Sequence, residues 1–382
     1  MTVLAGLTWD HPRGRDALEA AAERLPEALS IRWHAQPLEG FESAPVAELA
    51  RDHDLLVLDH PHLGDALAGA SLRRLDELFP AALLAEWADR TAGPSFESYR
   101  MADGLWALPL DAATQVGARR ADLLPDAPED WASVLELSRR VPVALNLAGP
   151  HAFLSLCSIA VAFGDEPCVD AHAPLLPHDA VESALALMRE VTARAPAGSA
   201  ALNPIALLSR MAEEGDIVHC PLVYGYVNFS SPRLTHPITF SDAPAGPEGR
   251  RGSTIGGTGL AITARAVVTR PLLEHLAWLM SPDAQQRFIP THNGQPSARA
   301  AWTDPAINDA AGDFYRNTIA TLEQSWVRPR FPGYIPFQTA ASAVVRATAL
   351  GHRTIRDGAD ELAKLHARAL ERMQPTEDRE RT

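Results

Sequence analysis

The sequence is poor in the residues that mark several common kinds of protein. It contains three cysteines, Cys157, Cys168 and Cys220, without a Cys-x-x-Cys pair, so we expect neither a disulfide framework nor a zinc cluster. Lys364 is the only lysine, and the net charge of -14 argues against a nucleic-acid partner. No apolar run approaches the ~20 residues that cross a bilayer, so we expect no direct membrane insertion.

The first residues of the sequence lack the pattern of a leader, and the last ones lack the apolar side chains of a folded segment. Met1 leads directly into an apolar segment, without the basic region or small-residue cleavage site of a leader. We therefore expect a cytoplasmic location for the sequence as it stands, and a periplasmic one if a leader has been removed. Residues 374–382 are charged and lack large apolar side chains, and we expect a disordered tail over residues 373–382.

The length of 382 residues exceeds what one hydrophobic core usually serves, which indicates two domains. Two extended segments, Gly104–Gln115 and Gly252–Ile262, each lie between βα-rich regions and are interpreted as crossings between two lobes. The predicted bounds are residues 1–109 plus 260–318 for the N-lobe, and residues 112–256 plus 322–372 for the C-lobe.

Apolar periodicity predicts an α/β fold in both lobes. The first lobe begins with a β-α-β-α-β pattern, which predicts a parallel sheet covered by helices on both faces. Its expected strands are 3–9, 30–35 and 55–59, and its expected helices are 16–25 and 46–51. The second lobe has expected strands at 141–146 and 217–224, with expected helices at 131–139, 151–163, 181–191 and 205–214. Later helices are expected at 272–280, 314–324, 341–350 and 355–370.

Polar residues follow the first strand, at the edge where such sheets bind ligands. Trp9, Asp10, His11 and Arg13 stand between a strand end and a helix start, where unpaired N–H groups favour an anion or a polar group. Trp9 can stack on a sugar ring or a base, and Arg13 can grip a carboxylate or phosphate. In the alternative interpretation, Trp9 is a core residue and Arg13 an exposed charge.

The sequence Asp59-His60-Pro61-His62 follows the third strand. It could supply half of a metal site, but no matching cluster stands elsewhere, so we favour a hydrogen-bonding His60 in the cleft and expect no metal. Asp111, just past the first crossing, is either a cleft residue or an ordinary polar group of a loop.

Further candidates lie on the second crossing and in the second lobe. Gly256 and Gly257 permit close backbone approach and hinge motion, and their run lacks the Lys-Ser/Thr ending of a phosphate loop, so no cofactor is expected. Asn146, Tyr224 and Tyr226 form the expected binding edge of the second lobe. The two tyrosines are either an aromatic platform or half-buried core residues.

The order of these features resembles the bilobal solute-binding proteins of ATP-driven importers that take up sugars and oligosaccharides. The resemblance extends over residues 3–370. It rests on a first strand ending in Trp, the Gly104–Pro109 crossing, the Trp131 helix, the Ile255-Gly256-Gly257 return strand, the helix with Ser281-Pro282-Asp283, and Gly294-Gln295-Pro296. It implies two α/β lobes that close on ligand by hinge bending, and it places Arg328 and Tyr334 near the cleft.

Two functional hypotheses follow. The first is a monomeric receptor that closes over a small sugar or anionic metabolite and works with permease subunits of an ABC importer. The alternative is a cytosolic sensor or enzyme on the same fold that binds an anionic acyl, phosphate or CoA-type metabolite. We expect no catalytic residues.

Overall fold

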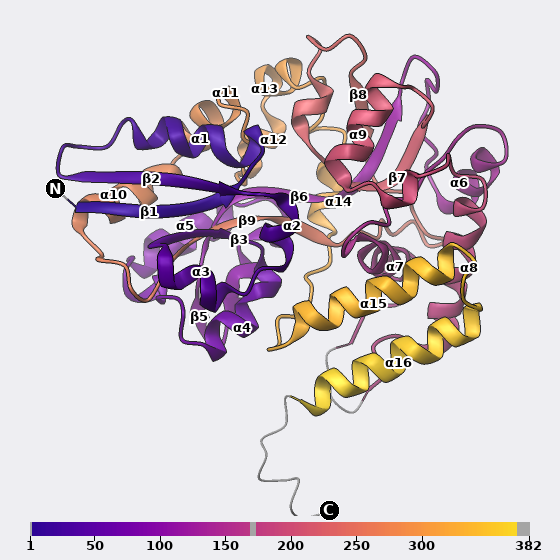
Figure 1. Cartoon of the computed structure of the whole chain (residues 1–382). Coiled ribbons are helices and arrows are strands. Elements are labelled where there is room, and N and C mark those ends of the chain that lie inside the picture. Colours follow the sequence, from indigo (N-terminus) through magenta and orange to yellow (C-terminus); the bar gives the residue numbers. More distant parts are fainter. Residues whose placement is uncertain (1, 169–172, 373–382) are drawn as a thin grey trace, which may run out of the picture.

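The computed structural model describes residues 2–168 and 173–372, and it has the mixed α/β architecture that the sequence predicts (Figure 1). The predicted disordered tail, residues 373–382, lies outside the described residues. Among the described residues, no helix combines the length and the apolar character needed to span a membrane.

Within the described residues, seven strands form one sheet that runs through both halves of the molecule in the order β2-β1-β3-β9-β6-β7, with β8 also paired to β6. The strands are β1 (Thr2–Trp9), β2 (Leu29–Gln36), β3 (Leu55–Leu58), β6 (Leu108–Arg120), β7 (His219–Tyr224), β8 (Ile238–Ser241) and β9 (Ile255–Ile262). Strands β2, β1 and β3 are parallel, whereas β9 runs antiparallel to β3. A separate hairpin is formed by β4 (Arg100–Met101) and β5 (Gly104–Leu105).

Strands β6 and β9 connect the two halves of the sheet, as the two predicted crossings require. The first part of β6 pairs with β9, and its second part pairs with β7 and β8. The strand continues to Arg120, five residues beyond the predicted end of the crossing. A third passage lies beside them, because Thr254 forms a parallel bridge with Trp326.

The first helix of the chain begins earlier than periodicity suggests. Helix α1 starts at Pro12 rather than Asp16, because the Nδ1 atom of His11 accepts the backbone N–H of Arg13 (3.1 Å) and proline suits the first helical position. Arg13 therefore lies in the first turn of α1. The helices of the first half are α1 (Pro12–Ala22), α2 (Leu38–Ser43), α3 (Val46–Asp52), α4 (Leu63–Ala68), α5 (Ala81–Arg90), α10 (Arg270–Leu279) and α11 (Ile289–Thr291). The short helices α12 (Arg299–Thr303) and α13 (Pro305–Ala310) follow α11 in the chain and pack against the core of the second half.

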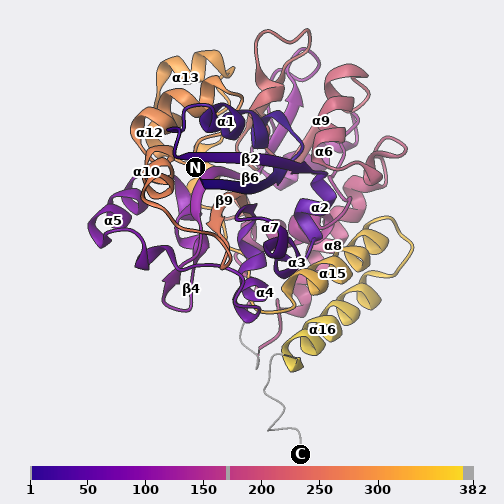
Figure 2. The same ribbon diagram turned by 60° about the vertical axis from the view of Figure 1, so that its left-hand side comes forward.

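The second half is more helical (Figures 1 and 2). Its helices are α6 (Trp131–Ser138), α7 (His151–Ala162), α8 (His178–Thr192), α9 (Pro204–Glu213), α14 (Ile319–Glu323), α15 (Tyr334–Ala349) and α16 (Ile355–Glu371). The strand predicted at 141–146 is wrong: the segment makes only an isolated bridge between Val143 and His219, and Pro142 has no N–H for a ladder. The helix predicted at 314–324 is reduced to α14.

Among the described residues, three hydrophobic clusters form the core. The first underlies β1 and β3, and the second lies among α7, α8, α15 and α16. The third packs on β6, β7 and β8 and includes Trp302, Phe314 and Tyr315. These three residues fall within 260–318, the segment that the sequence assigns to the N-lobe, but their packing partners belong to strands of the second half.

Candidate ligand-binding site

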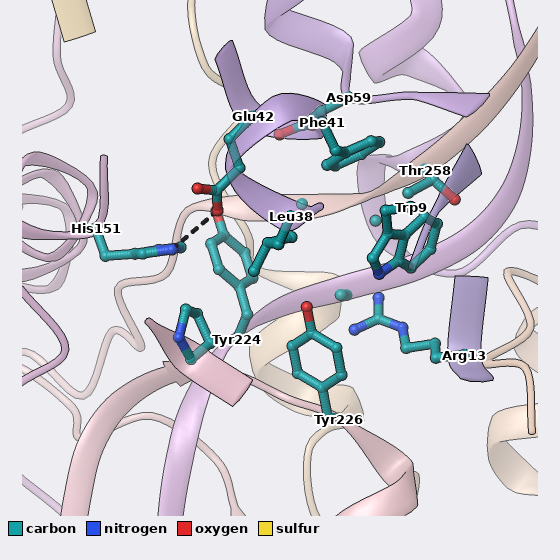
Figure 3. Close-up of a pocket in the computed structure, with 14 residues that line it drawn as sticks. Trp9, Arg13, Leu38, Phe41, Glu42, Asp59, His151, Tyr224, Tyr226 and Thr258 are labelled. Atoms are coloured by element: carbon teal, nitrogen blue, oxygen red, sulfur yellow. Dashed lines mark ion pairs between the residues drawn. The ribbon is translucent and has the colours of Figure 1, made fainter. Parts of the chain in front are cut away.

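A cavity of about 60 Å³ lies between the two halves, beyond the carboxyl ends of β1 and β3 (Figure 3). This is the sheet edge to which the sequence argument pointed. The lining residues come from the first half, from the crossing strands and from the second half: Trp9, Arg13, Leu38, Phe41, Glu42, Asp59, Ala113, His151, Pro204, Tyr224, Tyr226, Gly256, Gly257 and Thr258.

The volume shows how far the two halves have closed. A site needs roughly 10–15 Å³ of such volume to hold one water, and pockets for drug-sized ligands measure roughly 300–1,000 Å³. The cavity therefore accommodates only a few atoms in this conformation. A ligand of the size of a monosaccharide requires the halves to separate further.

Arg13 joins three parts of the molecule at one end of the cavity. Its Nε donates to Asp111 on β6 (2.8 Å), one NH2 group donates to the other oxygen of Asp111 (2.5 Å), and the second donates to the carbonyl of Gly225 (2.9 Å). Both side chains are about 5% exposed. Burial raises the pKa of Asp111, and the guanidinium opposes this shift. The Nε atom and both terminal nitrogens of Arg13 therefore already donate to acceptors within the protein.

The ring of Tyr226 packs against the guanidinium of this ion pair. The Arg13 guanidinium lies 4.7 Å from the centre of the Tyr226 ring, and the His11 ring packs edge-on against it at 4.9 Å. Burial, reinforced by the charge of Arg13, lowers the pKa of His11 to about 4, so the imidazole that caps α1 is neutral at pH 7. Figure 3 shows Trp9 above the Arg13 guanidinium and Tyr226 below it.

A second buried guanidinium lies near the other end. Arg328 donates to Asp59 and, at 3.3 Å, to Gln338 on α15. Burial alone would raise the pKa of Asp59, but Arg328 and His60 outweigh burial and hold that pKa below its usual range. The Nδ1 atom of His60 lies 3.0 Å from Asp59, and burial, followed by the charge of Arg328, lowers the pKa of His60 to about 4.

Helix α2 covers the cavity from the first half. It is a six-residue helix preceded by Pro37 and followed by Pro45, and none of its residues is buried. Phe41 packs against Trp9 with ring centres 5.2 Å apart. Glu42 reaches the second half, where its Oε1 lies 3.0 Å from the Nε2 of His151, the first residue of α7.

Several buried polar atoms on the cavity wall have no hydrogen-bond partner among the described residues. They are the Nε1 of Trp9, the Oγ1 of Thr258 and both ring nitrogens of His151, whose contact with Glu42 lacks hydrogen-bond geometry. Unpaired buried polar groups are costly in proteins. A ligand with oxygen atoms could accept the indole N–H and the threonine hydroxyl proton.

Gly256 and Gly257 bring β9 against both sides of the site. A Cβ on Gly256 would lie 2.5 Å from the Tyr224 ring, and one on Gly257 would lie 2.4 Å from the carbonyl oxygen of Asp111. Gly257 also has φ +89°, a conformation that favours glycine. The tight packing of the crossing strands at the cavity therefore requires both glycines.

The structure brings some predicted site residues to the cavity and not others. Those on the wall are Trp9, Arg13, Tyr224, Tyr226, Gly256 and Gly257. Asp111, His11, His60 and Arg328 lie behind it and contact residues of the wall. Three residues are elsewhere: Asp10 is exposed and pairs with Arg15, Asn146 donates to the carbonyl of Leu202 (2.7 Å), and Tyr334 packs in the second core cluster.

Sequence reasoning missed the contribution of α2 and of α7. Leu38, Phe41 and Glu42 fall between two prolines, in a segment with no strong periodicity, and His151 follows Pro150 at a helix start. The signal that could have found them is the rule that residues after strand ends meet at one edge, because α2 directly follows β2. Thr258, on the second crossing, follows the two glycines that were selected.

The His, Asp and Glu side chains of the described site are not arranged as a metal centre. In residues 2–168 and 173–372, no group of three or more His, Cys, Asp or Glu side chains is arranged to hold a metal ion. His60 and His62, weighed from sequence as half of a metal site, are both buried, and burial lowers the pKa of each.

Comparison with solved structures supports the fold. The chain is similar to an ABC transporter solute-binding protein from Agrobacterium radiobacter K84 in complex with ribitol (18% identity, 97% of this chain and 98% of that one, TM-score 0.79). It is also similar to maltose-bound MalE3 of T. maritima (17%, 97% and 100%, TM-score 0.76) and to a cyclic maltosyl-maltose binding protein of Arthrobacter globiformis (12%, 97% and 99%, TM-score 0.78). The bilobal solute-binding fold implied by the resemblance is thus confirmed over nearly the whole chain.

In sequence, no family model and no curated protein matches the chain.

Proposed function

We propose that this protein is a solute-binding receptor whose two halves close over a small, hydroxyl-bearing ligand. The observation that carries the proposal is the cavity between the halves, whose wall presents the unpaired polar atoms of Trp9, Thr258 and His151 beside aromatic rings. Hydroxyl groups of a sugar or polyol can accept and donate hydrogen bonds to such atoms, while its C–H faces pack on the rings.

The buried ion pairs oppose an anionic ligand. Arg13, which the sequence offered as an anion-binding group, is held by Asp111, and Arg328, which the resemblance placed near the cleft, is held by Asp59. An anion would have to displace a buried carboxylate from each guanidinium, and separating such a pair is costly. The structural neighbours that bind ribitol, tagatose and mannitol support a polyol or sugar without acidic groups as the ligand class.

A transport role would add a partner. Several structural neighbours are ABC transporter solute-binding proteins. We therefore include recognition of the closed form by permease subunits in the proposal, with a location outside the cytoplasmic membrane.

A thermal-shift screen tests the receptor function. Ribitol, mannitol, tagatose, maltose and glycerol would be compared with matched carboxylates, because a ligand that binds only the folded state raises the melting temperature by mass action. We expect a concentration-dependent rise for at least one polyol or sugar. Trp9→Ala should remove the rise, whereas Trp326→Phe, outside the cavity wall, should retain it. No rise with any polyol or sugar would contradict the proposed function.

A further inference from the structure

The carboxylates around the cavity are not all paired with a guanidinium group. In the part of the chain that the structure describes, two guanidinium groups and three carboxylates lie on the wall or directly behind it. Arg13 is paired with Asp111, and Arg328 is paired with Asp59. The remaining carboxylate belongs to Glu42.

Glu42 has no guanidinium partner in the part of the chain that the structure describes. Its ion-pair contact is His151, which carries a charge only when the imidazole is protonated. His151 is 2% exposed, and neither of its ring nitrogens makes a hydrogen bond within the described residues. The local charge is therefore negative with a neutral imidazole and balanced with a protonated one, and in neither state does it attract an anion.

Aromatic faces add to this preference. Trp9, Phe41, Tyr224 and Tyr226 line the cavity, and the faces of such rings attract cations within about 6 Å. The ring of Tyr226 already faces a cation, the guanidinium of Arg13. Figure 3 shows Glu42, His151 and Tyr224 together on the opposite side of the cavity from that guanidinium.

We propose that the cavity prefers a ligand with a positively charged amine beside its hydroxyl groups, and that Glu42 is the residue that recognises this charge. The inference rests on the receptor function proposed above and narrows its ligand class. The amine binds the Glu42 carboxylate in place of His151. The hydroxyl groups bind the unpaired atoms of Trp9 and Thr258.

Two matched sets of compounds test the preference by isothermal titration calorimetry. The three-carbon set is 2-amino-1,3-propanediol, glycerol and glycerate, and the six-carbon set is D-glucosamine, D-glucose and D-glucuronate. Each set holds the carbon skeleton close to constant and changes the charge from positive to neutral to negative. In the set that fits the cavity, we expect the amine to bind about tenfold more tightly than the neutral compound, because hydrogen bonds to charged groups are the stronger ones.

Variants of α2 assign the preference to one residue. Glu42→Gln keeps the shape of the side chain and removes its charge, so it should bring the affinity for the amine to that for the neutral compound. Glu39→Gln is the matched control, since Glu39 belongs to the same helix, is exposed and contacts Asn203 outside the cavity wall. It should leave the ratio of the two affinities unchanged.

The outcomes separate this inference from the receptor function. A neutral or acidic compound that binds wild-type protein at least as tightly as the amine overturns the inference and leaves the receptor function intact. An amine preference that persists in Glu42→Gln overturns the role of Glu42. Absence of binding in both sets, together with a negative screen of polyols and sugars, overturns the inference and the receptor function together.

Discussion

The two buried arginine–aspartate pairs beside the cavity differ in how completely they are enclosed. In the Arg13–Asp111 pair both side chains are about 5% exposed, and the guanidinium also binds the carbonyl of Gly225. In the Arg328–Asp59 pair the aspartate side chain is 18% exposed and accepts the backbone N–H of His60. The pKa of Asp111 is raised and that of Asp59 is lowered.

The difference indicates separate roles for the two pairs. Burial determines the direction of the pKa shift at Asp111, whereas Arg328 and His60 determine it at Asp59. The first pair joins α1, the crossing strand β6 and the turn after β7, so it links both halves to the strand that connects them. The second joins the end of β3 to the segment before α15.

The largest expected effect comes from Arg13→Ala. It leaves Asp111 buried without its partner, which should lower the free energy of unfolding by about 3–5 kcal/mol in urea titrations. The double variant Arg13→Met with Asp111→Leu is the control, because it removes both charges and should recover most of the loss. A loss below about 1 kcal/mol for Arg13→Ala would contradict the role of burial in this pair.

Arg328→Ala should have a smaller effect. Asp59 keeps the His60 N–H and partial contact with solvent, so we expect a loss of about 1.5–3 kcal/mol, the value of a hydrogen bond to a charged group. The same urea titrations compare the two arginine variants directly. If Arg328→Ala proves more destabilising than Arg13→Ala, exposure is not what distinguishes the pairs.

Gly257→Ala should disturb the Arg13–Asp111 pair, because the new methyl group would contact the backbone of Asp111. The new Cβ would lie 2.4 Å from the Asp111 carbonyl at φ +89°, so we expect a loss of about 1–3 kcal/mol in the free energy of unfolding. Gly249→Ala is the control for the backbone term, because Gly249 has φ +79° and nothing within 4 Å of its Cβ. Equal losses for the two variants would show that the close contact with β6 contributes nothing.

The smallest effect concerns acid stability. Because the folded-state pKa of Asp59 is lowered, its contribution is present above the unfolded-state value of about 3.9 and is lost as the pH falls below it. Asp59→Asn should therefore flatten the decline in melting temperature between about pH 5 and pH 2.5. The folded-state pKa of Asp111 is raised, so its contribution to stability is present below the unfolded-state pKa and is lost as the pH rises. Asp111→Asn should therefore not flatten the decline in melting temperature at acidic pH. If the melting temperatures of Asp59→Asn and wild type decline equally as the pH falls, Asp59 does not contribute to the acid sensitivity of the fold.

Sequence patterns predicted the strands of the first half well, because β1 and β3 are short apolar runs and β2 alternates apolar with polar residues. They also indicated two crossings and the sheet edge where Trp9 and Arg13 lie. They failed where tertiary partners decide the outcome. Pro142 interrupts a strand that looked continuous, and Arg13 finds its partner 98 residues away in the chain. Glu42 and His151 meet across the halves, which no local spacing could reveal.

Closure of the two halves on ligand is tested most directly by small-angle X-ray scattering with and without the sugar or polyol that raises the melting temperature most. Since a cavity of about 60 Å³ cannot admit a monosaccharide, the ligand-free protein must sample a wider form. The account predicts a radius of gyration that decreases when the compound is added at saturating concentration. A radius that stays constant, although calorimetry shows binding, would contradict closure.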